Sequence, residues 1–197
     1  MLQEDSDKML KRIEHQEEAI TSISEVRRYA EAQRRAKFMY RPLVKELQTL
    51  NKKGNYLEIG AGPGILAAIL SEKDPNLRIT AVDLSAQMAD VACEYFSSHH
   101  LQDRINYIVC DVRDENIIPE LGKFDLVYST LSLHHWREPK KVIRNLWQIV
   151  KDNGVLYICD FKRVWWLYHL PGANFIRAAY NSGEIREILL SSRTTNP

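Results

Sequence analysis

The sequence lacks an excess of either charge, a long apolar run and a signal peptide. Lysine and arginine number 27 and aspartate and glutamate 26, so a net charge of +1 gives no overall attraction to nucleic acid or anionic membranes. No apolar stretch approaches the roughly 18 residues of a membrane-spanning helix. Acids stand near the N-terminus, where a signal peptide carries a basic and then an apolar segment. These absences favour a cytoplasmic protein with no membrane span and no nucleic-acid partner.

Cysteine is also scarce. Cys93, Cys110 and Cys159 are widely spaced, and two of them lie inside apolar runs. We therefore expect small buried thiols in a reducing compartment, with neither a disulfide framework nor a metal site.

What is present is a pattern that changes near residue 50. Within residues 4–50, apolar side chains recur every three or four positions, which predicts helix. Pro42 lacks a backbone donor and disfavours helix at Arg41, so the helix should break or restart there. We predict an N-terminal helical segment over residues 1–50 and a core over residues 51–197.

Strands and helices alternate in the core. We expect strands at 56–60, 77–85, 104–111, 124–130 and 154–161, and helices at 65–73, 86–98, 139–150 and 183–190. Asn153-Gly154 is predicted to close the third of these helices, because glycine adopts the left-handed conformation at little cost. Strands that are apolar on both faces indicate a parallel sheet covered by helices on both sides. Ligands of such sheets bind beyond the carboxyl ends of the strands.

A glycine-rich turn follows the first strand. Gly60, Gly62 and Gly64 permit positive φ angles and close approach of a ligand, and a helix begins directly after them. The dinucleotide pattern G-x-G-x-x-G would place the third glycine one residue later. Glu58 also puts a carboxylate where a pyrophosphate would have to lie. The turn therefore favours a ligand that presents cations or hydroxyls over a nicotinamide cofactor.

Acids end the next two strands. Asp83 stands where an acid meets ribose hydroxyls, although Asp83 or Ser85 could instead cap the following helix. Asp111 can accept a hydrogen bond from an exocyclic amine, and the backbone N–H of Val112 can donate to a ring nitrogen. Both are features of adenine. Asp125 lies at the other end of its strand and is interpreted as structural.

The segments LEIGAGPG, VDLS, CDV and FDLVYSTLSLHHW, in this order and spacing, resemble the class I S-adenosylmethionine-dependent methyltransferases. Within them the chain is similar to the broad small-molecule group related to the ubiquinone-biosynthesis methyltransferases, over residues 25–190. The resemblance implies a Rossmann-like three-layer sandwich with a mostly parallel sheet. The antiparallel strands that usually finish this sheet are missing before residue 197, which suggests either a truncated chain or a sheet completed otherwise. The open edge that results favours pairing into a homodimer.

The resemblance also implies roles for individual residues. Glu58 would hold the ammonium of the cofactor's methionine part above the glycine turn, Asp83 the ribose hydroxyls, and Asp111 the adenine amine. Leu84 and Met88 would lie near the adenine, and Ser129 beneath the sulfonium. The full predicted cofactor set is Glu58, Gly60, Ala61, Gly62, Gly64, Asp83, Leu84, Met88, Asp111, Val112 and Ser129. A helix at 25–41 would cover the cofactor, with Tyr29 and Tyr40 facing it.

Methyl transfer from a sulfonium needs alignment and exclusion of water, and a base only if the nucleophile carries a proton. The candidate bases are His134 and His135, after the fourth strand. Alternatively, one histidine caps the following helix and Trp136 packs into the core. The aromatic stretch 164–175 could line a substrate pocket, form a lid or meet a partner.

We therefore predict an S-adenosylmethionine-dependent methyltransferase that acts on an unidentified small-molecule acceptor. The alternative is a regulatory or scaffolding protein that binds the cofactor without turnover of its own.

Overall fold

The fold was examined in a computed structural model, which describes residues 10–13, 22–169 and 173–193. Five strands form one sheet: β1 (Asn55–Ile59), β2 (Arg78–Asp83), β3 (Ile105–Val109), β4 (Phe124–Thr130) and β5 (Val150–Cys159). Their order is β3-β2-β1-β4-β5, and every neighbouring pair is parallel. The chain order reverses between β1 and β4, so ligands are expected beyond the carboxyl ends of these two strands.

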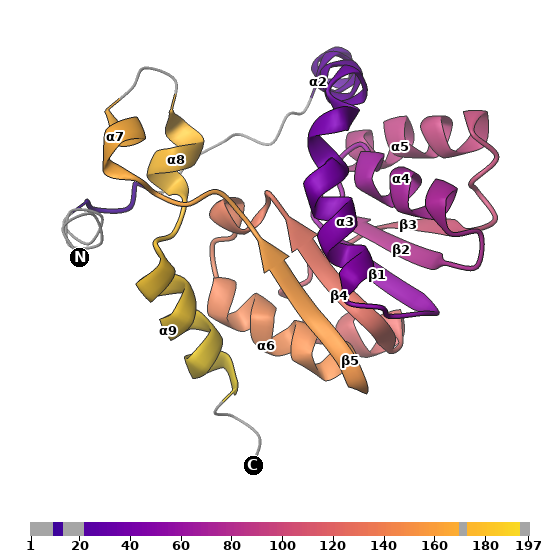
Figure 1. The fold of residues 1–197 in the computed structure, drawn as a ribbon. Coiled ribbons are helices and arrows are strands. Elements are labelled where there is room, and N and C mark those ends of the chain that lie inside the picture. The colour runs from indigo at the N-terminus through magenta and orange to yellow at the C-terminus, as the bar shows by residue number, and fades with distance from the viewer. Residues whose placement is uncertain (1–9, 14–21, 170–172, 194–197) are drawn as a thin grey trace.

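Helices cover both faces of the sheet (Figure 1). On one face lie α3 (Arg41–Thr49), α4 (Ile65–Lys73) and α5 (Ala86–Ser98), whose buried side chains pack against Tyr56 of β1. On the other lie η2 (Ile118–Leu121) and α6 (Pro139–Ile149), which pack against Leu57 and Ile59 of the same strand. Alternate residues of β1 thus point to opposite layers, as the pleat of a strand requires. The predicted three-layer α/β fold is confirmed.

The remaining helices surround this sandwich. In the N-terminal segment, α2 (Ile23–Arg35) packs on α5, and η1 (Lys37–Tyr40) leads into α3. A short turn, η3 (Leu133–His135), follows β4, while α7 (Trp165–Tyr168), α8 (Asn174–Ala178) and α9 (Ser182–Arg193) follow β5. Figure 1 shows α9 alongside α6, and α7 and α8 near the carboxyl end of β5.

Several predicted boundaries agree with the structure. The helices predicted at 65–73 and 86–98 and the strand predicted at 124–130 match α4, α5 and β4. The break at Pro42 is also confirmed, because η1 ends at Tyr40 and α3 restarts with this proline in its first turn. Helix throughout residues 4–50 was wrong in part: residues 10–13 are not helical, and residues 4–9 and 14–21 lie outside the described residues.

The prediction for Gly154 was wrong. The helix ends at Ile149, and Asn153 and Gly154 lie within β5 beside an irregularity in its pairing with β4. Gly154 has no positive φ; instead, a Cβ there would come within 2.9 Å of the carbonyl oxygen of Phe124. The Cβ would also lie 2.7 Å from the Val150 side chain and 2.9 Å from the Lys151 carbonyl oxygen, so close packing within β5 and against β4, rather than a left-handed helix end, explains this glycine.

The cysteines are free thiols, as predicted, but only partly buried. Cys110 and Cys159 are half-buried, whereas Cys93 is exposed on α5, so the expectation of buried thiols was wrong for Cys93. In the part of the chain that the structure describes, no helix is long and apolar enough to cross a membrane.

Candidate functional site

The glycine turn after β1 has the strained backbone that its sequence predicts. Gly60, Gly62 and Gly64 have φ angles of 70°, 51° and 73°. A Cβ on Gly64 would lie 2.4 Å from the Phe96 ring, and one on Gly60 would lie 2.1 Å from the Ser132 hydroxyl oxygen. Gly62 differs, because a Cβ there would meet nothing within 4 Å. The middle glycine thus leaves open space above the turn, where a ligand can contact the backbone.

Glu58 is a buried acid directly beneath this turn. Its side chain accepts a hydrogen bond from the Tyr128 hydroxyl at 3.1 Å and another from the backbone N–H of Ala67, in the first turn of α4. Burial raises the pKa of Glu58 to about 8, because removal from water penalises the charged form. A buried acid with an elevated pKa is typical of a site that receives a cation.

Asp83 ties the second strand to the glycine turn. Its carboxylate accepts hydrogen bonds from the backbone N–H of Gly62 at 2.9 Å and of Ser85 at 3.0 Å. The cap of α5 is Ser85, whose hydroxyl accepts from the N–H of Met88. The choice left open between Asp83 and Ser85 is thereby resolved, and Asp83 is placed at the turn with unused lone pairs on both oxygens.

Asp111 is held by an arginine that the sequence did not single out. Arg113 donates to Oδ1 of Asp111 at 3.0 Å and to Oδ2 at 2.9 and 2.5 Å, and this pairing lowers the pKa of Asp111. The carbonyl of Val112 accepts from the side chain of Asn145 at 2.9 Å, which ties this segment to α6. The segment after β3 is therefore fixed by contacts within the protein.

Apolar side chains surround these acids. Leu84, just after β2, is 65% exposed, and Val109, at the end of β3, is 46% exposed, so two large apolar groups face solvent beside Asp83 and Asp111. Met88 is partly buried and packs with Val26 of α2. Exposed apolar groups at strand ends are suited to cover the face of a planar ring.

The fourth strand contributes a buried hydroxyl. Ser129 is 1% exposed, and its hydroxyl oxygen has no hydrogen-bond partner. A buried polar atom without a partner is costly and rare in native proteins. Its position near the carboxyl end of β4 agrees with a group that is completed by a ligand.

The two candidate bases differ in their surroundings. His134 is 3% exposed, and its Nδ1 lies 2.8 and 2.9 Å from the carboxylate oxygens of Asp160, at the carboxyl end of β5. The backbone N–H of His134 also donates to Asp160, at 2.6 Å. His135 is exposed, with its ring 3.9 Å from that of His134. The structure therefore favours His134 as the candidate base, because its buried ring is oriented by a carboxylate.

The alternative interpretation, with a histidine cap and a core Trp136, was correct only for Trp136. The cap residue of α6 is Glu138 and it uses no side-chain cap, so capping by a histidine was wrong. Trp136 does pack against the core, and its indole N–H donates to the Ser132 hydroxyl at 3.0 Å. Asp125 also behaves as predicted, because it binds the backbone of Asn55 and the side chain of Lys151.

Aromatic rings extend the site beyond His134. The Phe161 ring lies 5.7 Å from that of His134 and 4.7 Å from that of Phe175 in α8. Part of the stretch 164–175 thus joins this cluster, while residues 170–172 lie outside the described residues. On the side of the N-terminal segment, Tyr40 donates to Gln33 at 2.6 Å, and burial, with Tyr29 and Glu58 nearby, raises its pKa.

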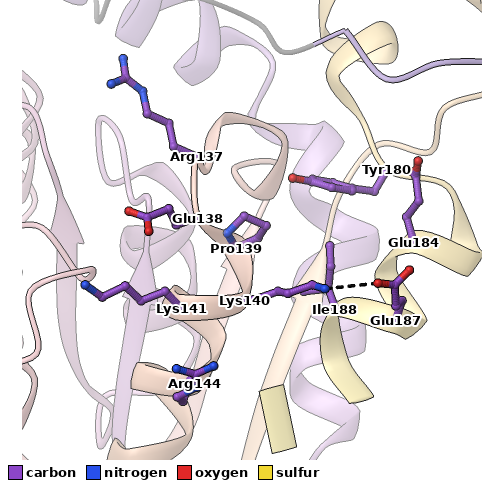
Figure 2. Close-up of a pocket in the computed structure, with 10 residues that line it drawn as sticks. All are labelled: Arg137, Glu138, Pro139, Lys140, Lys141, Arg144, Tyr180, Glu184, Glu187 and Ile188. Carbon is purple, nitrogen blue, oxygen red and sulfur yellow. Dashed lines mark hydrogen bonds and ion pairs between the residues drawn. The ribbon is translucent and has the colours of Figure 1, made fainter. Parts of the chain in front are cut away.

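A separate groove of about 620 Å³ runs between α6 and α9 (Figure 2). Lys140 crosses towards Glu187, with 3.2 Å between Nζ and Oε1, while Arg137 and Lys141 project to the other side of α6. Its lining includes no residue of the glycine turn. Among the described ranges, no cluster of histidine, cysteine and acids could hold a metal.

Comparisons with known proteins agree with this geometry. The fold and the glycine turn define a Rossmann-like α/β protein with its site at the carboxyl ends of the strands. The family described as "Methyltransferase domain" matches residues 57–156, and the chain belongs to this family. The predicted relationship to the class I methyltransferases is thereby confirmed.

Two curated relatives align with this chain over more residues than the family model matches. The chain is 28% identical over 132 residues to the ubiquinone biosynthesis O-methyltransferase of Coxiella burnetii, covering 66% of this chain and 54% of the relative. It is 31% identical over 135 residues to the malonyl-[acyl-carrier protein] O-methyltransferase of Priestia megaterium, covering 68% and 46%. The chain thus spans about half the length of these relatives.

Solved structures share the fold. A SAM-dependent methyltransferase from Aquifex aeolicus has a TM-score of 0.69 at 21% identity, covering 87% of this chain and 88% of that one. A plantazolicin methyltransferase, solved in complex with a substrate analogue and SAH, has a TM-score of 0.68 at 19% identity, covering 86% and 67%.

Sequence reasoning missed Tyr128 and Arg113, and it placed Asp160 at the ligand-binding edge of the sheet without giving it a role. Tyr128 contacts Glu58, Arg113 contacts Asp111 and Asp160 contacts His134. Only Asp160 had a signal, since it follows the fifth predicted strand at the edge where ligands bind.

Proposed function

We propose that the protein transfers the methyl group of S-adenosylmethionine to a hydroxyl group of a small molecule. The observation that carries this proposal is the glycine turn, where three positive φ angles bring the backbone beside the acids Glu58 and Asp83. Membership in the methyltransferase domain family supports it. The named relatives are enzymes, which favours catalysis over the regulatory alternative.

The residues present fit this cofactor. Glu58 would hold the ammonium group, the turn from Gly60 to Gly64 would contact the methionine part, and Asp83 would accept from the ribose hydroxyls. Asp111 and Val112 would hold the adenine between Leu84 and Met88, and Ser129 would lie near the sulfonium. The partnerless Ser129 hydroxyl and the open space at Gly62 support this assignment, since both call for a ligand at the turn.

S-adenosylmethionine would supply a methyl group on a sulfonium, whose sulfur leaves as a neutral thioether without further activation. His134 acts as the base. Its Nδ1 is held by Asp160, so the proton of the neutral ring is placed on Nδ1, where it donates to the carboxylate. Nε2 then keeps a lone pair that can take the proton of an acceptor hydroxyl.

The acceptor side is aromatic. His135, Phe161 and Phe175 lie around His134, and the exposed rings of His135 and Phe175 could stack on a planar acceptor. The N-terminal segment over residues 1–50 would cover the cofactor, with Tyr29 and Tyr40 at its edge. A cytoplasmic location and a homodimer remain predictions.

Calorimetry and a turnover assay test the proposal. S-adenosylmethionine or its demethylated product should bind with a Kd in the low micromolar range, about −8 kcal/mol. Labelled S-adenosylmethionine should then mark a small molecule in a metabolite extract. No heat with either ligand on folded protein would contradict the cofactor. Tight binding without labelling of any metabolite would favour the regulatory alternative.

A further inference from the structure

Residues 10–13, here called the N-terminal strap, lie against the segments that follow β5. Figure 1 shows the strap as a short indigo piece beside α7. The carbonyl of Lys11 accepts from the Tyr168 hydroxyl at 2.8 Å, and the N–H of Ile13 donates to the carbonyl of Arg177 at 3.1 Å. The strap is thus tied to α7 and α8 on both sides of Arg12.

Arg12 reaches from the strap towards the candidate base. Its Nε donates to the carbonyl of Ala178 at 2.7 Å, at the end of α8, and its Nη2 donates to the carbonyl of His134 at 3.1 Å. The guanidinium carbon lies 4.2 Å from the centre of the Tyr180 ring. The planar guanidinium suits such simultaneous contacts, because its donors have a fixed geometry and its face can stack on an aromatic ring.

His134 is therefore fixed through both ends of its own backbone. Its N–H and its ring are bound to Asp160, while its carbonyl is bound to Arg12. A side chain keeps its direction only when the peptide groups that carry it are held. We propose that Arg12 is a positioning residue that holds His134 in its reactive orientation and so makes the N-terminal strap part of the acceptor site. This inference rests on the proposed role of His134 as base.

The contacts of the strap separate this role from simple attachment. Without the Arg12 side chain, the strap keeps the bonds of Lys11 and Ile13, whereas the carbonyl of His134 loses the Arg12 donor. Conversely, loss of the Tyr168 hydroxyl weakens the attachment of the strap and leaves the bond to His134 in place. Both changes weaken the attachment of the strap, since Arg12→Ala also loses the bond to Ala178 and the contact with Tyr180, but only the first removes a donor from the carbonyl of His134.

The test follows the ring proton of His134 by NMR on protein labelled with 15N-histidine. In the wild type, the proton between Nδ1 and Asp160 should exchange slowly with water. In Arg12→Ala, its exchange should be about tenfold faster, since opening of η3 no longer breaks the Arg12 hydrogen bonds. Arg12→Lys should give an intermediate rate and Tyr168→Phe a rate near the wild type. The Kd for S-adenosylhomocysteine should change less than about twofold in each variant, because no cofactor contact is altered.

A wild-type exchange rate in Arg12→Ala would overturn the proposal, and so would an equal acceleration in Tyr168→Phe. If Arg12→Ala does not fold, Arg12→Lys decides: faster exchange than in the wild type supports the proposal, and an unchanged rate overturns it. Failure of the proposed function gives a different result. Either S-adenosylhomocysteine does not bind the wild type, or His134→Gln retains turnover while the exchange result for Arg12 stands.

Discussion

The cofactor half and the acceptor half of the site are built in different ways. The cofactor half, at the ends of β1, β2 and β3, is joined by contacts within the sheet and its turns, such as Gly62 to Asp83 across 21 positions and Glu58 to Tyr128 across 70. The acceptor half, at the ends of β4 and β5, also includes the N-terminal strap. His134 meets Asp160 across 26 positions and Arg12 across 122, and Arg12 meets Ala178 across 166.

This difference shows which structural features determine the ligand that each half binds. In the cofactor half, the backbone conformation of the turn shapes the site, because Gly60, Gly62 and Gly64 all adopt positive φ. In the acceptor half, side chains from distant segments meet around one histidine. The cofactor half can therefore keep one ligand, while the side chains of the acceptor half can vary with the acceptor molecule.

The largest effect is expected from replacing Gly64, in the cofactor half, with alanine. Alanine there would have to adopt a φ of 73° and place its Cβ 2.4 Å from the Phe96 ring. The backbone conformation and the overpacking together should lower the free energy of unfolding by about 3 kcal/mol. Urea unfolding measures this change.

Gly62→Ala is the control for Gly64 in this unfolding experiment. Gly62 has a φ of 51°, and a Cβ there would meet nothing within 4 Å, so alanine should cost only the backbone conformation, about 1 kcal/mol. Equal losses in the two variants would show that packing against Phe96 does not matter.

The next effect tests the acceptor half at His134. Replacement by Gln should lower turnover roughly a hundredfold and leave cofactor affinity nearly unchanged, because a base is lost and no cofactor contact is altered. Asp160→Asn should lower turnover less, since the ring remains but loses its carboxylate partner. Initial rates with labelled S-adenosylmethionine on the acceptor found in the extract measure both.

His100→Asn is the control for these histidine variants. His100 is exposed at the end of α5 with a φ of 56°, a conformation that asparagine tolerates. If His134→Gln turns over as fast as this control, catalysis depends on alignment alone and the base assignment is wrong.

The same comparison explains what the sequence could predict. The order of strands and helices, the glycine turn and the acids Glu58, Asp83 and Asp111 follow from local patterns, since period, glycine spacing and strand ends are visible in the chain. The contact of Tyr128 with Glu58, that of Arg113 with Asp111 and that of Asp160 with His134 do not. Arg113 is only two positions from Asp111, but this spacing alone does not predict the pair, because a long arginine side chain can reach several partners.

Gly154 and Arg12 illustrate the limits further. The sequence Asn153-Gly154 matches a helix end, yet the tertiary approach of β4 and β5 decides its conformation. Arg12 lies in a stretch with helical spacing, but its contacts with Ala178 and His134 join residues 166 and 122 positions apart in the sequence. Local propensity is overridden in both places by contacts that form only on folding.

A smaller effect tests how the cofactor half holds the ribose. Asp83→Ala should weaken the binding of S-adenosylhomocysteine by about 2 kcal/mol, because hydrogen bonds from the hydroxyls to a charged carboxylate are lost. Asp83→Asn keeps one acceptor oxygen for the N–H of Gly62 and should lose less. Calorimetry measures affinity and thermal unfolding measures stability. Unfolding of Asp83→Ala, with affinity retained in Asp83→Asn, would identify Asp83 as a structural residue.

The smallest effect concerns protons at Glu58. Its pKa of about 8 means that the carboxyl group is largely neutral near pH 7 in the free protein. An ammonium bound beside it would lower this pKa, so binding should release a proton. The Kd for S-adenosylhomocysteine should therefore tighten as pH rises towards 8, by at most about tenfold per pH unit. Calorimetry in buffers of different ionisation enthalpy counts the released proton.

Glu58→Gln separates this linkage from other effects of pH. Since glutamine does not titrate, the variant should bind more weakly near pH 8 and lose the pH dependence of its affinity.

The stability of the free protein should fall with rising pH, whereas the affinity rises. Because the folded state holds the Glu58 proton up to about pH 8 and the unfolded state loses it near 4.5, the wild type loses stability as pH rises between these values. Glu58→Gln should thus unfold at a higher temperature than the wild type above pH 8. A pH-independent wild-type affinity, or the same slope in the variant, would mean that the ammonium lies elsewhere and that Glu58 serves the first turn of α4 alone.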